Sequence, residues 1–261
     1  MLWEKKMILA LILFACGEKT ETKAPEPVTS ENTTENTVEK ASVKSTPAGK
    51  KEGKVLLDGV EKTVFWDDGD TFAFTGEDGK KVKARLNGLN TLESYGPVHQ
   101  WGSWTEAELY TLAKECAGFA AAEKWTCIDT QKGGGYGRIL VDCPDFRKAI
   151  LEAGLAHPFS VDTPAPEEDI SAMNIAIEGK KGIWAKGVPK HLITSLHSQD
   201  EKEDQDAYNR ICVTETGQCD AVTHTETYGV CQKVCHDDSC MTYVPYKQRY
   251  GNNAADCLKI E

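Results

Sequence analysis

The chain has 261 residues and a formal net charge of −11 at pH 7. This length is sufficient for one domain with a hydrophobic core plus an extension. A protein that holds long nucleic acid through many phosphate contacts is normally basic on its binding face, so the acidic balance argues against a high-affinity DNA-binding module. An enzyme that seats one phosphate in a local cationic pocket remains compatible with it.

The first 16 residues have the pattern of a bacterial export signal. Lys5 and Lys6 precede an apolar run, Met7 to Ala15, which is far shorter than the roughly 20 residues that span a bilayer. Leu13-Phe14-Ala15-Cys16 resembles a lipobox, which makes Cys16 the expected lipidation site and the first residue of the mature chain. The alternatives are a plain signal peptide with an incidental cysteine, or a short membrane anchor. The expected location is the cell envelope, lipid-anchored on a periplasmic or outer-membrane face.

Composition divides the rest of the chain into three parts. Residues 17–54 are rich in Glu, Thr, Lys, Pro and Ser and contain no aromatic residue, so we expect a disordered tether. Residues 55–187 have the patterning of a folded domain. Residues 188–261 hold six of the ten cysteines and form a Cys-rich extension.

Periodicity predicts a small α+β domain. Strands are expected at 71–74, 82–86, 124–129 and 137–142, and helices from the capping box at Thr105 to Ala120, at 146–155 and at 167–181. In the second strand Ala84 and Leu86 alternate with charged residues. If they face a core, Arg85 must project from the opposite face of its strand.

Cysteines indicate an oxidising compartment. The six between Cys212 and Cys257 predict three disulfides, although sequence cannot choose among their pairings. Of the other three, we expect Cys127 to pair with Cys143 across a hairpin and Cys116 to remain buried on a helix.

Three short segments carry candidate chemistry, namely Asp68 to Thr71, Arg85 to Glu93 and Tyr136 to Arg138. Arginine can hold two phosphate oxygens with its planar fork, so Arg85 and Arg138 on separate strands can approach one phosphate from two sides. Oxygen ligands suited to a hard cation such as Ca²⁺ are offered by Asp70, Asn90, the Thr91 carbonyl and Glu93.

The order and spacing of these segments, with Gly154-Leu155-Ala156 and Gly182-Ile183-Trp184 behind them, resemble the staphylococcal nuclease (thermonuclease) family. The resemblance covers about residues 60 to 187. It implies a five-stranded OB-type β-barrel with about three helices that hydrolyses DNA and RNA with Ca²⁺, cleaving the 5′-O–P bond. It also implies that Glu93 orients the attacking water, that Asp68 lies behind the metal ligands and that Tyr136 faces the substrate.

Two positions depart from the family pattern. Asn90 stands where the family has an aspartate, so one anionic ligand becomes a neutral amide and Ca²⁺ binding should weaken. Gly134 stands where the family often has an acid.

The sequence leaves several functions open. The leading expectation is an envelope-tethered, Ca²⁺-dependent nuclease, a monomer with nucleic acid as substrate and no protein partner. The second is a catalytically weak or inactive OB-type binding module on the envelope. A haem or zinc site around Cys231, Cys235, His236 and Cys240 is a third. Lys247, Arg249 and the nearby tyrosines either extend a strand-binding groove or pack and solubilise the extension.

Overall fold

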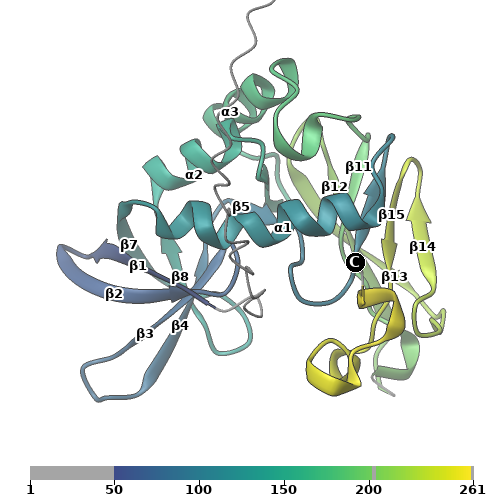
Figure 1. The fold of residues 1–261 in the computed structure, drawn as a ribbon, viewed down its shortest axis with the longest axis horizontal. Coiled ribbons are helices and arrows are strands. Elements are labelled where there is room, and N and C mark those ends of the chain that lie inside the picture. The colour runs from purple at the N-terminus through teal and green to yellow at the C-terminus, as the bar shows by residue number, and fades with distance from the viewer. Residues whose placement is uncertain (1–49, 202–203, 260–261) are drawn as a thin grey trace, which may run out of the picture. The chain divides into compact units, whose positions relative to one another are not determined.

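Six strands close into a barrel in the N-terminal part of the described chain (Figure 1). This computed structural model describes residues 50–201 and 204–259. The barrel strands are β1 Lys51–Leu57, β2 Val60–Trp66, β3 Thr71–Thr75, β4 Lys81–Leu86, β7 Lys124–Gly133 and β8 Ile139–Asp142. Their order around the barrel is β1-β2-β3-β4-β8-β7. The expected signal peptide, its lipidation site Cys16 and the tether up to residue 49 lie outside the described residues.

The barrel has six strands where five were expected. The additional pairing comes from the N-terminal hairpin, in which β1 and β2 are joined at Asp58 and Gly59, both with positive φ. β1 also pairs in parallel with β7, which closes the barrel. Gly53, Val55 and Leu57 point inward. The strand begins at Lys51, so its first four residues fall in the segment that was expected to be tether.

Aromatic residues fill the barrel core. Trp66 and Phe72 meet edge to face with ring centroids 4.9 Å apart, and Trp125 meets Phe146 in the same way at 5.0 Å. Ala84 and Leu86 are buried in the same core. Arg85 therefore projects from the opposite face of β4, as the alternation predicts.

Three α-helices are present in the described part of the chain: α1 Glu106–Ala121, α2 Pro144–Glu152 and α3 Glu167–Glu178. The capping box is confirmed, since Thr105 accepts from Glu108 N and the Glu108 carboxylate accepts from Thr105 N. α1 runs from the barrel to the C-terminal strands (Figure 1). Short 3₁₀ helices are η1 Gly182–Trp184, η2 Gln199–Glu201, η3 Tyr246–Gln248, η4 Gly251–Asn253 and η5 Asp256–Leu258. Trp184 is buried against Met173 and Ala176 of α3.

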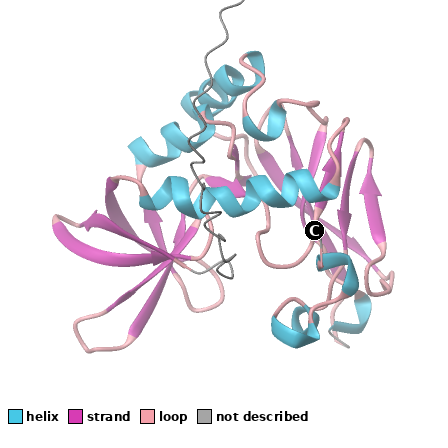
Figure 2. Cartoon of the chain, viewed as in Figure 1, coloured by secondary structure: helices cyan, strands magenta, loops and turns pink. Residues whose placement is uncertain are grey.

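The Cys-rich extension adds its strands to elements of the preceding domain (Figure 2). The remaining strands are β5 Leu89–Thr91, β6 His99–Trp101, β9 Ala156–Pro158, β10 Ser160–Val161, β11 His191–Ser195, β12 Ala207–Val213, β13 Gln218–His224, β14 Lys233–His236 and β15 Ser239–Thr242. One sheet has the order β10-β13-β12-β11 and another the order β14-β15-β6, while β5 pairs with β9. The extension is thus continuous with the fold, and all described residues belong to one compact unit.

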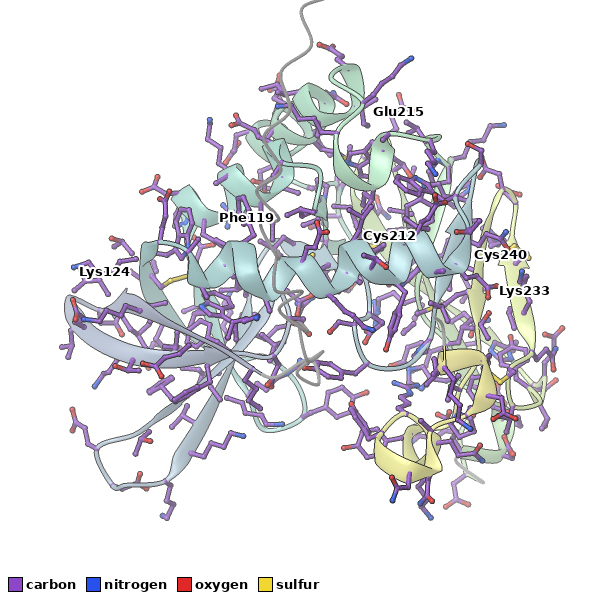
Figure 3. All side chains as sticks on the ribbon, in the orientation of Figure 1. Phe119, Lys124, Cys212, Glu215, Lys233 and Cys240 are labelled. Carbon is purple, nitrogen blue, oxygen red and sulfur yellow. A yellow bond between two sulfur atoms is a disulfide. The ribbon has the colours of Figure 1, made fainter. Side chains whose placement is uncertain are left out.

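Side chains reinforce this junction. Lys233 of β14, labelled in Figure 3, donates to Gln100 at 2.6 Å and pairs with Glu106 of α1 at 2.8 Å. The Cys212 side chain is buried in one cluster with Leu92 and Trp101. Residues more than a hundred positions apart therefore share a core.

Four disulfides are present in the described residues. The pairing of Cys127 with Cys143 is confirmed, and Cys116 is buried and free. The extension holds the pairs Cys212–Cys219, Cys231–Cys257 and Cys235–Cys240. Its cysteines are therefore not thiolates, and the haem or zinc site built on them is wrong.

Within residues 50–201 and 204–259, no helix combines the length and the apolar character needed to cross a membrane.

Candidate active site

The site begins at the turn between β2 and β3. The Asp68 carboxylate accepts from Asp70 N at 3.0 Å and from Thr71 N at 2.7 Å, which fixes the turn as an Asx motif. Burial, followed by the negative charge of Asp70, raises the pKa of Asp68 well above its usual range. Asp68 thus lies behind Asp70 and orients it.

Asp70 is buried, and both of its carboxylate oxygens are engaged. Oδ1 accepts from Thr71 Oγ1 at 2.9 Å and pairs with Arg85. Oδ2 accepts from Thr91 N at 2.9 Å and from Thr91 Oγ1 at 3.1 Å. Burial opposes ionisation of Asp70, but the charge of Arg85 and the Thr91 hydrogen bond outweigh it and lower the pKa.

Arg85 ties β4 to the segment that follows it. Besides its ion pair with Asp70, its Nη2 donates to Leu89 O at 3.0 Å and to Asn90 Oδ1 at 2.8 Å. The side chain is only 12 % exposed, and its Cζ lies 5.9 Å from the centroid of the Phe159 ring. Its guanidinium is therefore held in one position at the edge of the barrel.

Asn90 contacts both Arg85 and the neighbouring carbonyl. Its Nδ2 donates to Thr91 O at 2.9 Å and lies 3.4 Å from His157 Nε2. His157 is buried, which lowers its pKa to about 4 and keeps it neutral at pH 7, and its Nδ1 lies 2.8 Å from Pro158 O. An Nδ1–H donor leaves Nε2 as an acceptor facing the Asn90 amide. This network assigns the orientation of the amide.

Arg138 comes directly before β8, which pairs in parallel with β4, and so does not lie within a strand as expected. Its Nε donates to Gly134 O at 3.1 Å and to Gly135 O at 3.2 Å. Burial, followed by the positive charge of Arg85, lowers the pKa of Arg138. The two guanidinium groups therefore interact electrostatically.

The loop before Arg138 has no room for a side chain at Gly134. A Cβ there would lie 2.8 Å from Ile139 O and 3.0 Å from Arg85 Cβ. An acid at this position would therefore collide with β8 and with Arg85 of β4. Tyr136 follows with 88 % of its surface exposed and its ring 5.7 Å from the Arg138 guanidinium.

Glu93 lies on the loop after β5. Burial, followed by the negative charge of Asp70, raises its pKa, and the positive charges of Arg249, Arg85 and Arg138 act against that rise. A carboxylate with a raised pKa is a better proton acceptor than an ordinary surface glutamate. Arg249 comes from the extension, which sequence reasoning did not connect to Glu93.

A cleft of about 1100 Å³ lies between the barrel and the C-terminal strands, and it gathers these residues. All eight of the candidate site residues described by the structure line it: Asp68, Asp70, Arg85, Asn90, Thr91, Glu93, Tyr136 and Arg138. The extension forms the opposite wall, with Thr194 to His197, Tyr208, Arg210, Met241, Tyr246 and Arg249.

The cationic side chains of the cleft are of one kind. The chain has five arginines, and all of them line the cleft: Arg85, Arg138, Arg147, Arg210 and Arg249. None of the lysines that the structure describes does so. Arginine differs from lysine in its planar, bidentate fork, which matches phosphate geometry. Every arginine of this acidic protein therefore lies in one cleft, where the five guanidinium groups face five acids of the same lining: Asp68, Asp70, Glu93, Asp169 and Glu201.

Several of these residues were missed from sequence. His157 and Phe159 follow the Gly154-Leu155-Ala156 motif with no pattern of their own. Arg210 lies in a strand of the extension, and only long-range pairing brings it to the barrel. Arg249 carried a weak signal, since it stands among tyrosines, but Lys247 beside it does not line the cleft.

The oxygen donors fit a hard cation. Asp68, Asp70 and Glu93 are close enough that Asp70 contributes to the raised pKa of both other acids, and a cation would relieve that repulsion. Carboxylate, amide and carbonyl oxygens are the ligands that Ca²⁺ prefers. The fit is partial at Asn90, whose amide donates to the Thr91 carbonyl that would be a ligand.

A second group of potential ligands has a different chemistry. His191, His236 and Asp237 place one ligand atom each within 4.8 Å of one another, and His191 Nδ1 lies 2.7 Å from Asp237 Oδ2. Two imidazoles and a carboxylate suit zinc or copper rather than Ca²⁺. None of the three residues lines the cleft.

Comparison with known proteins does not assign the chain to a family, because neither a family model nor a curated protein matches it.

Proposed function

We propose that the protein is a Ca²⁺-dependent nuclease that hydrolyses phosphodiester bonds of DNA or RNA in the manner of staphylococcal nuclease. The observation that carries the proposal is the convergence of Arg85, Arg138 and Glu93 on one cleft that also holds the acid Asp70. Phosphodiester hydrolysis needs stabilised phosphoryl oxygens and an activated water, and these residue types supply both.

The two arginines bind the phosphate. Arg138 has no ion pair within the described residues, so its Nη groups can donate to phosphoryl oxygens. Arg85 is held by Asp70, so a phosphate must compete with that carboxylate. Asp70, Asn90, the Thr91 carbonyl and Glu93 would hold Ca²⁺, which when bound supplies positive charge at the phosphate and neutralises this competitor.

Glu93 accepts the proton of the attacking water. A bond forms from the water oxygen to phosphorus while the bond from phosphorus to O5′ breaks, which leaves a 3′-phosphate and a 5′-hydroxyl. The departing O5′ takes a proton from solvent. The raised pKa of Glu93 favours this role, because general-base efficiency rises as the pKa approaches the working pH.

The decisive experiment is hydrolysis of single-stranded DNA with Ca²⁺ and with a chelator, by wild type and by Glu93→Gln. The proposal expects Ca²⁺-dependent cleavage that falls by at least about a hundredfold in the variant. The isosteric amide keeps the volume of Glu93 and removes the base. Wild type that is equally inert with Ca²⁺ and with chelator would sink the nuclease proposal.

One observation favours the second candidate, a non-catalytic binding module. Asn90 and Asp70 both direct oxygens at Arg85, so the metal ligands are engaged internally. Such a module would bind DNA in the assay above and leave it intact.

We further propose that the enzyme is tethered to the cell envelope through lipidated Cys16. The proposal rests on the apolar run that ends at the lipobox-like segment. Fractionation of a bacterial host should place wild type with membranes and Cys16→Ser in a soluble fraction. Wild type recovered in the soluble fraction would contradict it.

A further inference from the structure

Arg210 of β12 is the least satisfied cation of the cleft. Within the described residues its buried Nη1 has no hydrogen-bond partner, and the side chain forms no ion pair. Its Cζ instead lies 5.9 Å from the Phe159 ring centroid and 5.7 Å from that of Tyr208. A buried donor without a partner lowers the stability of the folded state, because it has lost its hydrogen bonds to water. An anion that accepts from this donor removes the penalty.

Phe159 connects Arg210 to the proposed catalytic arginine. Each guanidinium carbon lies 5.9 Å from the centroid of this one ring, so Arg85 and Arg210 are at most about 12 Å apart. In nucleic acid each strand carries a phosphate roughly every 3.4 Å along a duplex axis and at longer intervals when extended. A strand with one phosphate at Arg85 therefore places a neighbouring phosphate within reach of Arg210.

Arg249 brings a further positive charge from the extension. Its Nε donates to Val244 O at 2.8 Å, and its stem packs on Gly96, where a Cβ would lie 2.6 Å from Arg249 Cδ. Gly96 belongs to the loop that carries Glu93. The Arg249 side chain thus packs on the loop that carries Glu93, and within the described residues no ion pair neutralises its charge.

Exposed aromatic rings flank these arginines. Tyr246, which lines the cleft, is 71 % exposed, and its ring centroid lies 5.7 Å from that of Tyr250. Tyr250 in turn lies 5.9 Å from Tyr95. Tyr95 is half-buried, so Tyr246 is the ring of this row that offers an exposed face to the cleft. Exposed rings beside cationic groups hold the bases of single strands without sequence preference.

We propose that the Cys-rich extension is a second substrate-binding wall, and that Arg210 holds a phosphate adjacent to the scissile one in a single-stranded polynucleotide. Arg249 adds charge beside it, and Tyr246 stacks a base. This inference rests on the proposed nuclease function and names its substrate class, a single strand of several nucleotides rather than an isolated diester.

The test compares two substrates that differ only in whether neighbouring phosphates exist. Wild type and Arg210→Gln are assayed on the oligonucleotide (dT)8 and on bis(p-nitrophenyl) phosphate. We expect kcat/KM on (dT)8 to fall roughly ten- to a hundredfold, the effect of losing one charged hydrogen-bonding group. On the small diester it should remain within about twofold, because that substrate has no second phosphate.

Binding supplies a readout that does not depend on catalysis. Fluorescein-labelled (dT)8 is titrated against the full chain in the Glu93→Gln background, with and without Arg210→Gln. The dependence of log Kd on log salt should flatten by about 0.7 when one phosphate contact is lost. Lys247→Gln is the matched control, since this cation belongs to the same extension and does not line the cleft.

The outcomes separate the two proposals. Equal losses on both substrates, or no loss on either, would overturn the role of Arg210 and leave the nuclease standing. An inactive wild type that binds (dT)8 through Arg210 would overturn the nuclease and support the second wall. A chain that neither binds nor cleaves (dT)8 would overturn both.

Discussion

The two walls of the cleft hold their arginines in different ways. On the barrel wall, Arg85 pairs with Asp70, and Arg147 pairs with Asp142 and Asp169. On the extension wall, Arg210 and Arg249 have no ion pair within the described residues, and Arg210 lies between aromatic rings.

The two walls therefore differ in whether the guanidinium group is fixed in position or left with an unneutralised charge. An ion pair fixes a guanidinium but lowers the net charge available to a phosphate, whereas an unpaired arginine keeps its charge. Arg138 is intermediate, because carbonyls of the Gly134 loop position it and no acid neutralises it within the described part of the chain. The barrel wall is thus arranged for geometry and the extension wall for attraction.

The largest effect is expected from Arg85→Gln on the barrel wall. Activity should fall by roughly 10²–10³, the usual loss for one donor at a developing charge. The free energy of unfolding should also fall by about 3–5 kcal/mol, because Asp70 remains buried and ionised without its partner. Urea denaturation and single-strand hydrolysis measure the two effects.

A double variant distinguishes these effects. Arg85→Gln with Asp70→Asn removes the orphaned charge, so stability should largely recover while activity stays lost. Recovery of activity in the double variant would show that Arg85 only neutralises Asp70.

On the extension wall, the disulfide Cys231–Cys257 closes the loop that carries Arg249. Removing this disulfide should loosen that loop. A separation of 26 residues predicts a loss of about 3 kcal/mol for Cys231→Ser/Cys257→Ser, measured by urea denaturation. The affinity for (dT)8 should weaken with it, while hydrolysis of bis(p-nitrophenyl) phosphate should persist under conditions where the variant is folded.

The matched control is Cys235→Ser/Cys240→Ser. This bridge spans only 5 residues between the paired strands β14 and β15, and its loop does not include Arg249. Equal losses of (dT)8 affinity in both double variants would indicate general loosening of the extension rather than displacement of Arg249.

The barrel and the extension also differ in how far the sequence predicts them. Local alternation and capping predict β3, β4, β7, β8 and the three helices, because their patterns lie within single segments. The pairing of β15 with β6 joins Ser239 to Trp101, and no local pattern specifies a partner at that separation. The eight described site residues could be named because they lie in three short motifs, whereas Arg210 could not.

Acid should lower the stability of the seam between the walls, by which we mean the pairing of β6 with β15 of the extension, through His99 of β6. The His99 ring is buried, and neither of its nitrogens has a hydrogen-bond partner within the described residues. Burial, aided by the neighbouring His157, lowers the pKa of His99 to about 3. Below pH 6.5 the unfolded chain binds a proton that the folded chain refuses, so stability falls as pH drops from about 6.5 toward 3. The same contribution is fully present above pH 6.5.

His99→Leu removes this proton uptake and keeps an apolar side chain in the seam. Between pH 7 and pH 5, wild type should lose about 2 kcal/mol more stability than the variant, as measured by urea denaturation at each pH. Identical pH slopes for the two proteins would show that His99 does not couple the seam to pH.

The smallest effect is expected at the proposed metal ligands of the barrel wall, as a change in Ca²⁺ affinity. Asn90→Asp adds a negative charge and removes the amide that donates to the Thr91 carbonyl. Both consequences favour a hard cation, so Ca²⁺ affinity should rise by roughly tenfold, about 1.4 kcal/mol, as measured by calorimetric titration.

Asn174→Asp on α3 makes the same change of charge away from the cleft and should leave Ca²⁺ affinity nearly unchanged. Equal gains in both variants would mean that net charge, not the ligand set, controls binding. A gain confined to Asn90→Asp, with hydrolysis of single-stranded DNA saturating at lower Ca²⁺, would mean that the neutral amide sets the Ca²⁺ requirement of the barrel wall.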